Sequence, residues 1–176
     1  MLSTSRAGYE QRIIPISGLL VCDNPKVILA SHSIGMGVVL AACDPVARIG
    51  GLFHALLPEA QAHLSRAKEK PGLFVDAGLA ALEFTLLASG AVSSRLLYFA
   101  AGGAQVMGAG GHLNIGLRNT DTLQQQLATR GLQLAGAHLG GHTCRSFYLA
   151  LETGQASVAL SGQLKEIPLC PPLTTT

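Results

Sequence analysis

Short apolar and β-branched runs separated by polar turn residues dominate the first third of the chain. This pattern is typical of β-strands, and its breaks fall at turn-forming pairs such as Asn24-Pro25 and Asp44-Pro45. We expect the runs to be neighbouring strands of one sheet. The predicted strands are Arg12–Val21, Val27–Ser31, Val38–Cys43 and Ile49–Leu56.

The pattern changes to helical spacing further along the chain. Residues 59–72 are polar and predict a mobile loop, whereas residues 74–89 carry apolar side chains at helical spacing and predict a core-packing helix. A second helix is predicted to begin at a cap formed by Asn119 or Thr120 and to run to Arg130. Further strands are expected at Leu96–Ala100, Leu132–Leu139, Ser146–Leu151 and Ala156–Leu160, followed by a frayed tail, Pro168–Thr176.

The length and composition fit one domain spanning residues 1–176. Hydrophobic residues make up 48% of the chain and charged residues only 12%, so much of the surface must be uncharged and suited to contacts with partners. The net charge of +2 provides no basic surface for nucleic acid. Polar residues interrupt every long apolar run, so we expect a cytoplasmic protein without membrane insertion.

The cysteines and histidines indicate neither a disulfide scaffold nor a metal site. His138, His142 and Cys144 lie close together in sequence, but two intervening residues are glycines and no second cluster supplies a fourth ligand. The glycine-rich residues 101–111 lack the patterns of nucleotide-binding loops. We therefore predict no metal and no cofactor. The four cysteines, expected as free thiols, are Cys22, Cys43, Cys144 and Cys170.

One segment, Ser31–Pro58, has a specific pattern: SHSIGMGVVLAACDPVARIGGLFHALLP. It resembles the active-site hairpin of the CheD family of chemoreceptor glutamine deamidases, which reads T-x-G-x-G-S-C-V, a strand, a D-P turn, I-G-G and H-x-x-L-P. The D-P turn, the I-G-G step and the H-A-L-L-P sequence are present here. The family's cysteine is absent.

Further pieces of the chain are similar to the family in the same order. They are FVDA from residue 74, GGAQVM from 102, IGLRN from 115, GG at 140 followed by Arg145, and ETG from 152. The resemblance covers about residues 24–158 and implies a layered α/β sandwich, with mostly antiparallel strands and two main helices packed on the sheet.

The resemblance also implies a chemistry, in which a cysteine thiolate attacks a glutamine carboxamide, ammonia leaves and water hydrolyses the thioester. His54 matches the histidine that shuttles protons, and Ser31 replaces a threonine. Ungapped alignment places the nucleophile position at Gly37. A gapped alignment places it at Val39, with Ser33 as the hydroxyl partner. Neither position carries a thiol.

Another cysteine could replace the missing nucleophile only if it lay beside His54. The hairpin sets Cys43 opposite Ile49 or Gly50, roughly 13 Å from His54 at ~3.3 Å per residue, which is too far. Cys144 remains open as a displaced nucleophile.

The ungapped alignment makes a geometric prediction about the site. Gly37 and His54 should lie on neighbouring antiparallel strands, with the His54 ring directed toward Ser31 at the mouth of a shallow surface groove. An empty volume the size of a thiol side chain should remain above Gly37.

These observations favour a CheD-like protein that has lost deamidase chemistry and binds the cytoplasmic helices of chemoreceptors or a CheC-type phosphatase. One alternative is an active deamidase, with Cys144 as nucleophile or with a natural cysteine replaced at position 37. Another is a module unrelated to chemotaxis that shares the sandwich.

Overall fold

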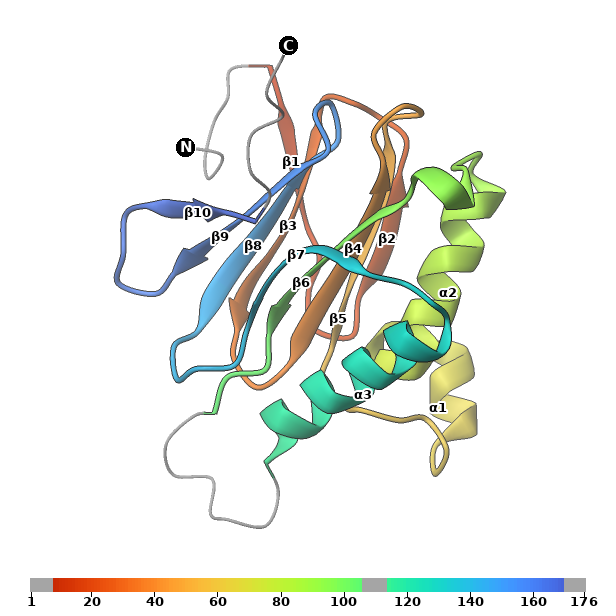
Figure 1. Ribbon diagram of the computed structural model, residues 1–176, viewed down its shortest axis with the longest axis vertical. Helices are drawn as coiled ribbons and strands as arrows, with labels where there is room; N and C mark the ends of the chain where they lie inside the picture. The colour runs from red at the N-terminus through yellow and green to blue at the C-terminus, as the bar shows by residue number, and fades with distance from the viewer. Residues whose placement is uncertain (1–7, 106–113, 170–176) are drawn as a thin grey trace.

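The computed structural model describes residues 8–105 and 114–169, which form two five-stranded sheets (Figure 1). The first sheet has the order β1-β3-β8-β9-β10 and contains β1 (Glu10–Ile13), β3 (Val27–Ile34), β8 (Arg145–Ala150), β9 (Gln155–Leu160) and β10 (Glu166–Pro168). The second has the order β2-β5-β4-β6-β7 and contains β2 (Leu19–Cys22), β5 (Ile49–Ala55), β4 (Val38–Asp44), β6 (Leu97–Gly102) and β7 (Leu134–Leu139). Neighbouring strands are antiparallel, except for the parallel pairs β1–β3 and β6–β7.

Two helices cover the outer face of the second sheet (Figure 1). They are α2 (Val75–Ala88) and α3 (Ile115–Thr129), and the short helix α1 (Leu64–Glu69) precedes them, with 3-10 turns at Pro71–Leu73 and Ser93–Arg95. None of the helices in the described part of the chain is long and apolar enough to cross a membrane.

The second sheet has an apolar core on each side, which explains why β4 and β5 are buried at every residue. One core lies between the sheets and includes Leu29, Val39, Leu52, Phe99 and Phe147. The other lies between the second sheet and the helices and includes Leu40, Phe53, Leu79, Leu82 and Leu123. The expected layered α/β sandwich, mostly antiparallel and with two main helices on a sheet, is confirmed.

The prediction of one sheet for the first third of the chain is wrong. β3 belongs to the first sheet, whereas β4 and β5 belong to the second, so the chain changes sheet at residues 35–37. The predicted strand over residues 12–21 is also wrong, because Pro15 and Ser17, which has a φ of +67°, form a turn between β1 and β2. Periodicity indicates strands but not the sheet to which each belongs.

Three other boundaries differ from expectation. The polar residues 59–72 contain α1, and α3 begins earlier than predicted because the side chain of Asn114 accepts a hydrogen bond from Leu117 N at 3.1 Å. Asn119 is therefore inside the helix. Pro168 ends β10 instead of opening a frayed tail, and residues 170–176 lie outside the described part.

Candidate active site

Ser31 and His54 meet between the two sheets. Alternation along β3 and β5 turns both side chains inward, and the Ser31 Oγ lies 2.9 Å from His54 Nδ1. Ser31 is fully buried and His54 is 2% exposed, so the prediction that the ring lies at the mouth of a surface groove is wrong. The predicted orientation of the His54 ring toward Ser31 is confirmed, although the two residues face each other across the sandwich rather than within one sheet.

The second partner of Ser31 determines which nitrogen of His54 carries the proton. Ser31 Oγ donates to the carbonyl oxygen of Ile14 at 2.8 Å. A hydroxyl has one proton, so Ser31 must accept from His54 Nδ1–H. His54 Nε2 then keeps its lone pair, which is the form that a general base requires.

The surroundings of His54 also hold the imidazole neutral. Burial lowers the pKa of His54 to about 4, from an ordinary value of 6.5, because the charged form loses its hydration. The His54 backbone is fixed as well, since its N–H donates to Gly18 O and its carbonyl accepts from Ser17 N. His54 is therefore a rigid, unprotonated base at neutral pH.

Gly37 occupies the position next to the free nitrogen of His54. Val39 is the direct cross-strand partner of His54. Gly37 lies two residues before Val39 and therefore faces the same side of the sheet as His54. A Cβ at Gly37 would lie 3.0 Å from His54 Nε2. Because the hydroxyl that contacts His54 belongs to Ser31 and not to the exposed Ser33, the geometry favours the ungapped alignment.

The predicted empty volume above Gly37 is absent. A Cβ at Gly37 would lie only 2.6 Å from the backbone oxygen of Ala55 and 3.3 Å from His54 Cδ2. Gly37 itself is buried. The strands therefore close over the space that a side chain at this position would occupy, and the expectation of a vacant thiol site is wrong.

The turn at residues 35–37 is tied to distant parts of the chain. Gly35 O accepts from Ala104 N at 2.9 Å and Gly37 O accepts from Gly103 N at 2.8 Å. The side chain of Asn119 donates a hydrogen bond to the carbonyl between them, that of Met36. Sequence reasoning assigned Asn119 to a helix cap and missed this contact, although the residue ends the IGLRN motif.

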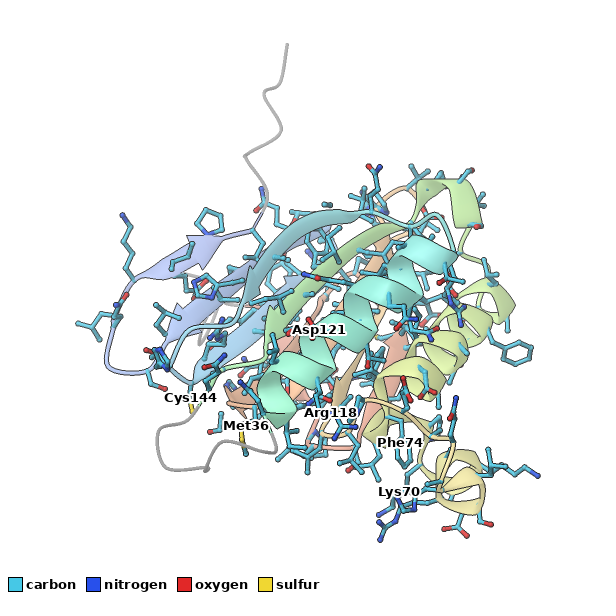
Figure 2. All side chains as sticks on the ribbon, turned by 60° about the horizontal axis from the view of Figure 1, so that its bottom comes forward. Met36, Lys70, Phe74, Arg118, Asp121 and Cys144 are labelled. Atoms are coloured by element: carbon cyan, nitrogen blue, oxygen red, sulfur yellow. The ribbon has the colours of Figure 1, made fainter. Side chains whose placement is uncertain are left out.

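The two candidate replacement thiols are placed differently. Cys43 pairs with Gly50 next to the turn, as predicted. Cys144 is partly exposed and directly precedes β8, and Figure 2 shows it at the same end of the molecule as the beginning of α3. Within the described residues, its thiol makes no hydrogen bond with His54.

The two histidines weighed as metal ligands contact other parts of the chain. His138 Nδ1 lies 2.6 Å from Arg145 Nη1, and His142 Nδ1 lies 2.9 Å from Gln105 O. The described part of the chain contains no group of three or more His, Cys, Asp or Glu side chains that could hold a metal ion.

Comparison with known proteins decides the family. The family model described as CheD chemotactic sensory transduction matches residues 56–160, more than half of the chain. The chain belongs to the CheD family. A module that only shares the sandwich is therefore excluded, and the family resemblance is confirmed.

CheD relatives match most of this chain. A protein of Symbiobacterium thermophilum, named probable chemoreceptor glutamine deamidase CheD, is 36% identical over 85% of this chain and 92% of its own length. The chemoreceptor glutamine deamidase CheD of Thermotoga maritima is 33% identical over 89% of this chain and 99% of its own. The match to the CheD family model begins two residues after His54, so Ser31, Gly37 and His54 lie outside it.

Proposed function

We propose that this CheD-family chain is a cytoplasmic chemotaxis protein that lacks deamidase activity. In this role it binds the cytoplasmic helices of chemoreceptors or a CheC-type phosphatase. The observation that carries the proposal is the glycine at position 37, beside the free nitrogen of a buried histidine.

Deamidation needs an atom that attacks the glutamine carbonyl, and Gly37 has none. His54 retains the lone pair and the Ser31 contact of a general base, but a base without a nucleophile transfers no acyl group. Ser31 is a poor substitute because it is fully buried and its proton is donated to Ile14 O.

The closed space at Gly37 supports the same conclusion. Loss of a cysteine alone would leave a cavity the size of its side chain, whereas here Ala55 O comes within 2.6 Å of the Cβ position. The chain is therefore packed for glycine at this position.

The test combines activity with binding. Purified protein is incubated with receptor cytoplasmic fragments that contain glutamine sites, and conversion of glutamine to glutamate is followed by mass spectrometry, with an active CheD deamidase as positive control. Binding of the same fragments, and of a CheC-type phosphatase, is measured by calorimetry. We expect binding of at least one partner without conversion.

Two variants separate this proposal from an active enzyme. Conversion that is lost in His54→Gln and in Cys144→Ser would establish Cys144 as the nucleophile and overturn the proposal. Absence of binding to both kinds of partner would overturn the regulatory role.

A further inference from the structure

Asn119 connects the residues just before β4 to the residue just after β5 by a single side-chain group. It is fully buried on α3, and its Nδ2 donates to Met36 O at 3.0 Å and to Leu56 O at 3.1 Å. Met36 directly precedes Gly37, and Leu56 follows His54 by two residues. Figure 2 shows Met36 at the end of the molecule where α3 begins.

We propose that Asn119 is a positioning residue, whose side-chain amide ties the turn carrying position 37 to the end of the strand carrying His54. The tie sets the separation between the family's nucleophile position and its base. This inference goes beyond the proposed function and does not depend on it, because it concerns the geometry of the site and not its activity.

The two partners of Asn119 require an amide at this position. Both are carbonyl oxygens, so the group between them must donate two hydrogen bonds, which an NH2 group can do and a carboxylate cannot. The orientation of the amide follows from the same contacts. Its Oδ1 is buried without a hydrogen-bond partner in the described part of the chain.

That unpartnered oxygen favours a positional role. An apolar side chain of similar volume would fill the same space without burying this oxygen, but it would leave Met36 O and Leu56 O without their donor. The contribution of Asn119 is therefore in its two donated bonds.

The backbone around Asn119 is arranged to bring α3 close to the turn. A Cβ at Gly116 would lie 2.5 Å from Ala104 O. The absence of a side chain at Gly116 therefore lets α3 pack close to Gly103 and Ala104, which bond to the turn. Gly103 and Ala104 donate to the neighbouring carbonyls, Gly37 O and Gly35 O. The carbonyls of residues 35, 36 and 37 thus each accept a hydrogen bond, and the bond to Met36 O is the one donated from α3.

The state of the His54 imidazole tests this role without requiring activity. The ring is neutral because water is kept away from it, so releasing the turn should hydrate it and raise its pKa. The His54 resonance is followed by NMR titration of the full-length protein and assigned by its loss in His54→Gln. In the wild type we expect it to remain in the neutral position from pH 8 down to about pH 5.

Asn119→Ala and Asn119→Leu are compared with the wild type. Leu keeps the volume and removes both donors, so the two variants separate the hydrogen bonds from a simple cavity. We expect the titration midpoint to rise by about one pH unit or more in both. Thr122→Val, at another buried position on α3, is the matched control and should leave the midpoint unchanged.

A folded Asn119→Leu protein with the wild-type midpoint would overturn the proposal, because filling the space would then suffice. Loss of folding in both variants would also overturn it, since Asn119 would then support the whole core and not a local tie. A similar rise in Thr122→Val would do the same, because any perturbation of α3 would then reach the ring.

Discussion

Gly37 stands where the resemblance to the CheD family predicts a cysteine, and we expect that replacing Gly37 by cysteine will not produce an active deamidase. The new Cβ would lie 2.6 Å from Ala55 O, where an ordinary contact is at least 3.4 Å. β4 and β5 must therefore separate locally by about 0.8 Å, in a region where every residue is buried. Overpacking of this kind costs about 1–3 kcal/mol.

The measurement compares the wild type, Gly37→Ala and Gly37→Cys by equilibrium urea unfolding. Because the clash belongs to the Cβ and not to the sulfur, we expect both variants to lose a similar amount of unfolding free energy, about 1–3 kcal/mol. Gly37→Ala is thus the matched control for the backbone movement, and any additional effect of Gly37→Cys belongs to the thiol.

The same Gly37→Cys protein is then assayed for conversion of receptor glutamine. We expect no turnover, because the Cβ position is too close to both Ala55 O (2.6 Å) and His54 Nε2 (3.0 Å), and the movement that relieves these contacts changes the geometry between the thiol and the base. A variant as stable as the wild type that deamidates receptor fragments would refute this reasoning, since the site would then be a preserved active centre lacking only its sulfur.

Three other predictions follow from buried polar groups. Burial lowers the pKa of His54 to about 4, so as the pH falls the unfolded chain takes up a proton at this histidine before the folded chain does. The free energy of unfolding should therefore fall by about 3 kcal/mol as the pH decreases from 6.5 to 4. Denaturant titrations at several pH values should show a smaller fall in His54→Gln. Arg95 and backbone amides hold the pKa of the buried Asp44 well below its usual range. Asp44→Asn should therefore lower the unfolding free energy by about 1–3 kcal/mol. Because Arg95 is partly exposed, a change near zero would mean that solvent screens the ion pair. Ser31→Ala should cost about 1–3 kcal/mol by thermal or chemical unfolding, since it leaves Ile14 O and His54 Nδ1 without their partner, and an unchanged midpoint would contradict the assigned contacts.

Much of the local organisation was predictable from the sequence alone. The hairpin closed by Asp44-Pro45, with Cys43 opposite Gly50, follows from strand period and turn chemistry. The helix at residues 75–88 follows from apolar spacing. The order of the family motifs was sufficient to predict membership of the CheD family, which the family model confirms.

The tertiary structure alone decided how these pieces meet. The sequence predicted that Ser31 lies near His54, but not that they face each other from different sheets. Strand period fixes which residues share a face and leaves open which sheet a strand joins, because pairing partners are distant in sequence. The closure of Ala55 O over Gly37 and the contact of Asn119 with Met36 depend on distances of a few ångströms between separate segments. Such distances result from the packing of the whole core, which no local pattern of residues specifies.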